Sequence, residues 1–165
     1  MENDKYIFRR KIDEDNDWIK TVASAQWGST KIISNDKIHD ILRLPGFVAD
    51  QDGKLTGVIL YAIENQQCEI VAIYSATEKK GVGTKLIDLV KGAAKENHCE
   101  RVWLFTTNDN TQALRFYQKR GFILTALRPN IIEQQRRIKP TIPLIGNNGI
   151  PIRDEIELKF DLRKQ

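Results

Sequence analysis

The first third of the chain combines one strand pattern with two helical patterns. Residues 5–12 read as a strand, and residues 15–27 read as a helix. Acidic residues before this helix suit the positive end of its dipole, and Gly28 suits the position just beyond its end. A weaker helical pattern begins at Lys37 and is stopped by Pro45-Gly46.

The middle of the chain predicts a hairpin, a further strand and a long helix. Asp52-Gly53 lies between the apolar runs 46–50 and 55–64, and this dipeptide is a strong hairpin signal. Residues 68–76 read as the next strand. After a segment that contains two glycines, apolar residues recur at helical spacing and predict a helix that ends near Asn97.

The last third alternates between strands and helices. We expect, in order, a buried strand at 101–108, a helix at 109–121, a strand at 122–128, a short helix at 129–139, a loop or edge at 140–151 and a closing strand at 154–162. Asp109 or Asn110 should cap the first of these helices, Gly121 should end it, and Pro129 should take the first position of the second. The whole pattern predicts an α+β protein, with a mixed sheet covered by helices on both faces.

Composition narrows the class of protein. With 165 residues, 41% of them hydrophobic and 29% charged, the chain is expected to form a single soluble domain over 1–165. No apolar run is long enough to span a bilayer, and the polar N-terminus is unlike a signal peptide. Cys68 and Cys99 lack metal-ligand spacing with His39 and His98, which have no partner evident in the sequence. We therefore expect reduced thiols, no metal and a cytoplasmic location.

The net charge of +4 is mild and is compatible with an anionic ligand. A basic nucleic-acid-binding module is disfavoured, because the chain has no clustered basic helix and no aromatic stripe on a strand face. One run of basic residues, Arg128, Arg136, Arg137 and Lys139, is expected to be a solvated basic face. A less favoured alternative has this run attract an anionic acceptor or a nucleotide phosphate.

The segment from Glu78 to Leu86 places two glycines and flanking lysines between a strand and a helix. Bare backbone and positive charge at a helix start suit a phosphate group. A Rossmann loop would need a third glycine where Leu86 stands, and a Walker loop would need the reverse order of Thr84-Lys85. The glycine pair alone also fits an ordinary turn, so it does not decide the function.

A second segment follows about thirty residues later. It has the pattern N-x-x-A-x-x-[LF]-Y-x-K-x-G-F, which is met by Asn110, Ala113, Phe116, Tyr117, Lys119, Gly121 and Phe122. Together with the glycine loop, it resembles the GCN5-related N-acetyltransferase (GNAT) superfamily over about 47–162. The resemblance implies a mostly antiparallel sheet of about seven strands, with a splayed central parallel pair formed by 68–76 and 101–108.

The resemblance also implies that acetyl-coenzyme A is the co-substrate and that it lies between these two strands. Its pyrophosphate would be held by the loop and helix start, through Lys79, Lys80, Gly81, Val82, Gly83 and Thr84. Its pantetheine arm would meet the backbone of Ile73, Tyr74 and Ser75 and the amide of Asn110. One departure is Glu78, which stands where the family commonly has Gln or Arg, and whose carboxylate cannot donate to phosphate.

Acetyl transfer to an amine needs a base and benefits from an acid. At pH 7 only about one lysine-like amine in 10³ is neutral, which adds roughly 4–5 kcal/mol to the barrier. Glu69 is the candidate base, because histone-acetylating members of the family have a glutamate at this point of a similar strand; otherwise it is a rim residue. Tyr117 is the candidate acid for the leaving thiolate; otherwise it is a core tyrosine.

The resulting hypothesis is an acetyl-CoA-dependent N-acetyltransferase that acetylates a primary amine by direct transfer in a ternary complex. We expect a backbone N–H near Ile73 as oxyanion donor, no covalent acyl-enzyme, no nucleic-acid or membrane partner, and a monomer or homodimer. The acceptor stays open among small amines, amino acids, antibiotics and proteins. The alternative is a non-catalytic acyl-CoA-binding regulator with the same fold.

Overall fold

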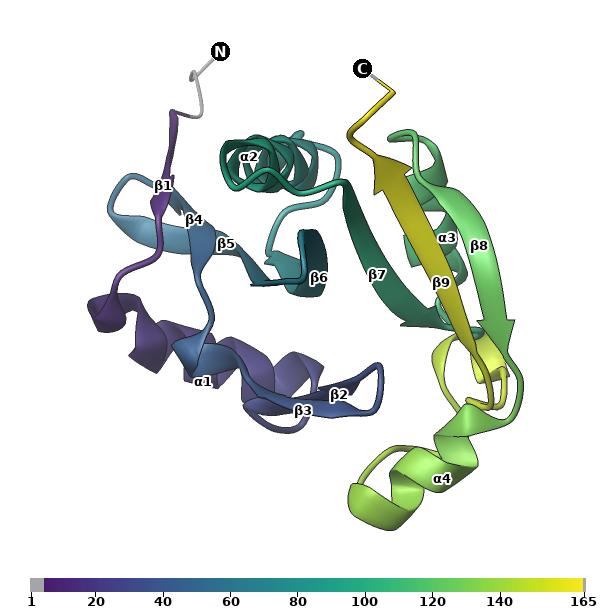
Figure 1. Cartoon of the computed structure of the whole chain (residues 1–165). Coiled ribbons are helices and arrows are strands. Elements are labelled where there is room, and N and C mark those ends of the chain that lie inside the picture. Colours follow the sequence, from purple (N-terminus) through teal and green to yellow (C-terminus); the bar gives the residue numbers. More distant parts are fainter. Residues whose placement is uncertain (1–4, 165) are drawn as a thin grey trace. The chain divides into compact units, whose positions relative to one another are not determined.

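The structure is a computed structural model that describes residues 5–164. It contains two compact units. One comprises the chain up to Val102 together with the residues from Leu162 onward, and the other comprises Trp103–Asp161. Seven strands form a mixed, mostly antiparallel sheet with one parallel pair, in the order β1-β4-β5-β6-β7-β9-β8 (Figure 1). This confirms the predicted α+β class.

The first unit contains most of the sheet and two long helices. Its elements are β1 (Tyr6–Arg10), α1 (Asn16–Gln26), β2 (Lys31–Ser34), β3 (Lys37–Asp40), β4 (Gly46–Gln51), β5 (Lys54–Glu64), β6 (Gln67–Ser75), α2 (Val82–Glu96) and the start of β7 (Arg101–Thr107). Strands β1, β4, β5 and β6 pair antiparallel in that order. The hairpin predicted at Asp52-Gly53 is confirmed, with φ of 54° and 82°.

Successive side chains of a strand point to opposite faces of the sheet, so both faces can be apolar. Helices α1 and α2 cover these two faces (Figure 1). One face packs against α1. The core on this side contains Ile19, Ala23, Ile41, Val48, Val58, Leu60 and Ala72. On the other face, a Cβ added at Gly57 would lie only 2.9 Å from Cγ1 of Val82. Glycine at this position therefore lets α2 approach the sheet closely.

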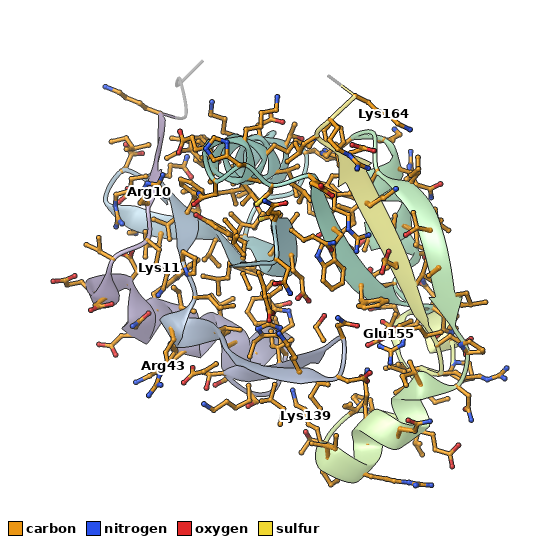
Figure 2. The ribbon with its side chains drawn as sticks, viewed as in Figure 1. Arg10, Lys11, Arg43, Lys139, Glu155 and Lys164 are labelled. Carbon is orange, nitrogen blue, oxygen red and sulfur yellow. The ribbon has the colours of Figure 1, made fainter. Side chains whose placement is uncertain are left out.

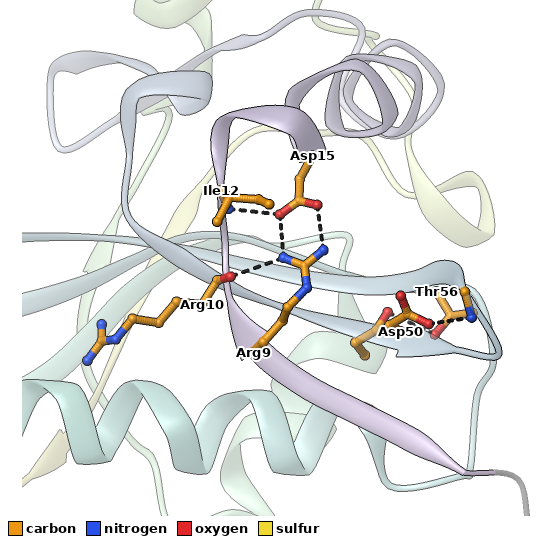
Figure 3. Close-up of polar contacts among 8 residues, drawn as sticks. Arg9, Arg10, Ile12, Asp15, Asp50 and Thr56 are labelled. Atoms are coloured by element: carbon orange, nitrogen blue, oxygen red, sulfur yellow. Dashed lines mark hydrogen bonds and ion pairs between the residues drawn. The ribbon is translucent and has the colours of Figure 1, made fainter.

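A bidentate ion pair ties β1 to the start of α1 (Figure 3). Both terminal nitrogens of Arg9 donate to the carboxylate of Asp15 at 2.8 Å, and the Ile12 backbone N–H donates to the same carboxylate at 2.9 Å. These donors lower the pKa of Asp15, because they favour its ionised form. The acidic residue predicted to favour the helix dipole thus also holds the chain entering the helix.

The prediction of a weak helix that begins at Lys37 is wrong. Strands β2 and β3 form a separate antiparallel hairpin, which is followed by a single 3₁₀ turn at Ile41–Arg43. The two-residue loop, Asn35-Asp36, has φ of 49° and 61°, which is the left-handed conformation of a type I′ turn. Asn and Asp tolerate this conformation better than other residues with a side chain, so local turn chemistry overrides the helical spacing.

The second unit contains the rest of β7, α3 (Thr111–Gln118), β8 (Ile123–Arg128), α4 (Ile131–Ile138) and β9 (Glu155–Asp161). Asn110 caps α3 by accepting a hydrogen bond from the Ala113 N–H at 3.1 Å, and Gly121 follows the helix with φ of 87°, as predicted. The cap of α4 is Asn130, so Pro129 precedes this helix and does not occupy its first position.

The prediction of a solvated basic face is wrong for two of its four residues. Arg128 pairs with Glu155 at 3.2 Å, and Glu155 is buried at the start of β9 (Figure 2). Arg136 donates to the backbone carbonyls of Ile142, Pro143 and Ile152. These two arginines therefore stabilise the fold of the second unit.

Candidate active site

The glycine loop connects β6 to α2 and contains two residues in the left-handed conformation. Gly81 caps α2 in the left-handed conformation, with φ of 77°, and Lys79 has φ of 66°. A Cβ at Gly81 would meet nothing within 4 Å, so glycine is favoured there by its positive φ and not by lack of space. Gly83 lies in the first turn of α2 and does not have a positive φ, so the backbone conformation does not require glycine at this position.

The loop presents charge and amide groups at the same place. Glu78, Lys79, Lys80 and Gly81 are exposed, whereas Val82 is buried and anchors the helix start. The first amides of a helix have no partner within the helix, and the dipole makes this end attractive to anions. An anion that approaches the loop would therefore meet two lysines and the N-terminus of α2.

Strand β6 is bent upstream of the predicted acetyl-CoA contacts. Leu60 pairs with Ala72 and Tyr61 pairs with Ile70, which leaves Val71 as the extra residue of a β-bulge. Beyond the bulge, Ile73–Ser75 pair with Gly57–Ile59 in regular register. The bulge thus separates the part of β6 that contains Glu69 from the part that leads into the glycine loop.

Glu69 is buried, with 6% of its surface exposed, so it is not a rim residue. The hydroxyl of Ser34 donates a hydrogen bond to Oε1 of Glu69, and Nε2 of His39 lies 3.5 Å from Oε2. Burial raises the pKa of Glu69, while the Ser34 hydrogen bond and the nearby His39 and Lys37 lower it. A raised pKa brings a carboxylate closer to the range that suits a general base.

Ser34 and His39 were not predicted as partners of Glu69. Both lie on the β2–β3 hairpin, where Ile32 pairs with His39 and Ser34 pairs with Lys37. The Asn35-Asp36 turn between two short apolar runs is a signal for this hairpin, although not for its contact with Glu69. His98, by contrast, is an exposed residue just after α2.

Asn110 caps the N-terminus of α3 and Tyr117 lies in the last turn of this helix, both in the second unit. The ring of Tyr117 is buried and makes edge contacts with Phe116 at 5.1 Å and Phe122 at 5.4 Å between ring centroids. Burial raises the pKa of Tyr117, so the phenol stays protonated at neutral pH. The tyrosine is therefore a core residue by packing, and its hydroxyl also has the protonation state that an acid needs.

The cysteines are unsuited to nucleophilic chemistry. Cys68 and Cys99 are both buried. Burial raises the pKa of Cys68 to about 12 and also raises the pKa of Cys99. Both groups are therefore thiols at neutral pH, and a thiol is a poor nucleophile.

Residues 5–164 show neither a metal-ligand cluster nor a membrane-spanning helix. There, no three His, Cys, Asp or Glu residues are grouped so that they could hold a metal ion. None of the helices in this part of the chain combines the length and apolar character needed to cross a membrane.

Comparison with known proteins identifies the family. The model of the acetyltransferase (GNAT) family matches residues 16–122, which is more than half of the chain. The chain belongs to the GNAT acetyltransferase family. The uncharacterized protein YdhI of Bacillus subtilis (strain 168) is 45% identical over 131 residues, covering 79% of this chain and 82% of that protein.

Solved GNAT structures share the fold. The IAA acetyltransferase from Bacillus cereus ATCC 14579 has a TM-score of 0.74 at 24% identity, covering 96% of this chain and all of that one. A GNAT family acetyltransferase from Elizabethkingia anophelis with acetyl-CoA bound has a TM-score of 0.69 at 20% identity, covering 97% of this chain and all of that one. The family match begins at residue 16, so it includes α1 and the β2–β3 hairpin, where the sequence showed no motif.

Proposed function

We propose that this GNAT protein is an acetyl-CoA-dependent N-acetyltransferase that acetylates a primary amine by direct transfer in a ternary complex. The observation that carries the proposal is the glycine loop, with Gly81 in the left-handed conformation at the N-terminus of α2. This geometry suits a pyrophosphate, and a structural neighbour contains bound acetyl-CoA.

The proposed acetyl-CoA contacts follow the chain from β6 into α2. Backbone groups of Ile73, Tyr74 and Ser75 would bind the pantetheine arm as a strand edge binds a peptide. The pyrophosphate would be held by Lys79, Lys80, Gly81, Val82, Gly83 and Thr84, through amides and lysine charge. Asn110 would add a contact from α3, in addition to its observed role as helix cap.

Two side chains would move protons. The carboxylate of Glu69 would accept a proton from the ammonium of the acceptor, which breaks an N–H bond and leaves a neutral amine able to attack. Bound acetyl-CoA supplies the activated thioester. The hydroxyl of Tyr117 would protonate the sulfur as the carbon–sulfur bond of the thioester breaks and the amine nitrogen bonds to the acetyl carbon. The resulting phenolate would take up the second proton that this nitrogen loses. The high pKa values of both cysteines favour this direct route over an acyl-enzyme.

The test combines binding with turnover. We expect calorimetry to detect acetyl-CoA binding by the wild-type protein. We also expect free thiol release with at least one amine from a panel of spermidine, L-phenylalanine, kanamycin, a peptide with N-terminal alanine and a peptide containing lysine. Binding without thiol release across the panel would favour the acyl-CoA-binding regulator. Absence of binding would contradict both functions.

A further inference from the structure

The β2–β3 hairpin delivers two polar side chains to one buried carboxylate. Ser34 has 7% of its surface exposed, Glu69 has 6%, and the side chain of His39 is 11% exposed. The Ser34 hydroxyl contacts one carboxylate oxygen of Glu69, and His39 lies beside the other. Ser34 lies on β2 and His39 lies on β3, so the placement of both beside Glu69 depends on the turn at Asn35-Asp36.

His39 is the unusual member of this group. Its Nε2 is buried and has no hydrogen-bond partner among residues 5–164, although Oε2 of Glu69 is 3.5 Å away. A buried polar nitrogen without a hydrogen bond is disfavoured unless charge or function compensates. The position of Nε2 beside a carboxylate oxygen indicates that its compensation comes from Glu69.

The charged groups around Glu69 come from two strands, β3 and β5. Strand β3 contributes His39 and Lys37, and strand β5 contributes Glu64, whose carboxylate pairs with Lys37. Positive charge on His39 or Lys37 favours the ionised form of Glu69, whereas Glu64 disfavours it. Cys68, the neighbour in sequence, is a neutral thiol at neutral pH because burial raises its pKa. Burial alone would otherwise favour the neutral form of Glu69.

We infer that Ser34 and His39 are positioning residues that hold the Glu69 carboxylate ionised and oriented to accept the proton of the acceptor's ammonium group. The inference rests on the proposed function, in which Glu69 is the base. An ionised carboxylate offers about four lone-pair sites. With one site on Oε1 taken by Ser34 and Oε2 facing His39, the carboxylate is fixed while lone pairs remain for the ammonium proton.

The first test measures Glu69 directly and needs no acceptor. In protein labelled with ¹³C at the glutamate carboxyl carbon, the Glu69 signal is assigned by its loss in Glu69→Gln, and its chemical shift is followed against pH. We expect Ser34→Ala and His39→Gln each to raise the pKa of Glu69, by about 1 pH unit, because each removes a group that favours the ionised form. Glu64→Gln should lower it, and the exposed His98→Gln should leave it unchanged.

An unchanged Glu69 titration in both Ser34→Ala and His39→Gln, with circular dichroism showing folded protein, would overturn the inference. Ser34→Thr keeps the hydroxyl and is the rescue variant, so its titration should match wild type. A wild-type-like pKa in Ser34→Ala alone would remove Ser34 from the proposal. A wild-type-like pKa in His39→Gln alone would remove His39.

The second test asks whether the effect reaches catalysis. With acetyl-CoA and the panel amine that gives the fastest thiol release, the acid limb of the kcat/KM profile should move to higher pH in Ser34→Ala and His39→Gln, and to lower pH in Glu64→Gln. A loss of rate that is equal at every pH would assign both residues a structural role only. If wild type releases no thiol, the proposed function fails, and the titration alone still decides whether the hairpin controls Glu69.

Discussion

At Glu69 and Tyr117, burial acts on two acids in the same direction, with different consequences. It raises the pKa of both groups, because each charged form is disfavoured away from water. For the carboxyl group, this brings the pKa toward the neutral range, where a base is effective. For the phenol, it secures the protonated form that can donate. Each group thus has a property that its proposed role would need, Glu69 as proton acceptor and Tyr117 as proton donor.

Tyr117→Phe tests the proton donor. We expect kcat to fall by about 10²–10⁴-fold, the usual range for a lost acid-base group, while acetyl-CoA affinity stays near wild type. The ring is retained, so its contacts with Phe116 and Phe122 should survive and the melting temperature should change little. Full kcat, with the chemical step shown to be rate-limiting, would make Tyr117 a core residue only.

Glu69→Gln tests the base through its pH dependence. If Glu69 removes the ammonium proton, kcat/KM should fall at neutral pH and recover much of the loss as the pH approaches the pKa of the amine. At that pH the acceptor arrives already neutral, so a base is no longer needed. A loss that stays constant with pH would show that Glu69 only orients the amine.

Among the helices and strands, the sequence predicted those whose signals are local and strong. The Asp52-Gly53 hairpin, the end of α2 near Asn97 and the Asn110 cap of α3 are all confirmed. The β2–β3 hairpin was missed, because its two strands have only four residues each and the helical spacing from Lys37 competed with the Asn-Asp turn.

For the candidate site too, the sequence predicted only the features with local signals. The glycine loop and Glu69 were found because they lie within continuous patterns of residues. Ser34 and His39 were not predicted, because they precede Glu69 by 35 and 30 positions in the chain and meet it only in the folded protein. Such contacts depend on tertiary structure, and a single sequence contains no direct signal for them.

The glycines of α2 offer a matched pair of substitutions. Gly81→Ala places a side chain at a φ of 77°, so we expect a loss of about 1–2 kcal/mol in stability and weaker acetyl-CoA binding. Gly92→Ala lies inside the same helix, where a Cβ would meet nothing within 4 Å. It should instead stabilise the protein by about 0.5–1 kcal/mol and leave binding unchanged. Urea denaturation and calorimetry measure both effects, and equal behaviour of the two variants would contradict the assigned role of Gly81.

Two buried carboxylates have opposite effects on the stability of the folded chain. The pKa of Asp15 is lowered, chiefly by its hydrogen bonds from Arg9, so this group stabilises the fold above its unfolded pKa and loses that effect as the pH falls through its folded pKa. The pKa of Glu69 is raised by burial, so folding makes its neutral form more favourable than it is in the unfolded chain. Its contribution is present at low pH and is lost as the pH rises through its folded pKa.

The two matching amide substitutions should therefore change stability in opposite directions. At neutral pH, we expect Asp15→Asn to lower the free energy of unfolding by about 1–2 kcal/mol, because it removes a charged partner of the half-exposed Arg9. Glu69→Gln should raise it by about 1 kcal/mol, because it removes a buried charge that the proposed function would retain at a cost in stability. Both differences should shrink toward pH 3, where wild-type Glu69 is already neutral and Asp15 begins to be protonated. Urea denaturation at pH 7 and pH 3 measures both. A Glu69→Gln protein less stable than wild type at pH 7 would mean that Ser34, His39 and Lys37 more than offset the cost of burial, and that Glu69 stabilises the fold.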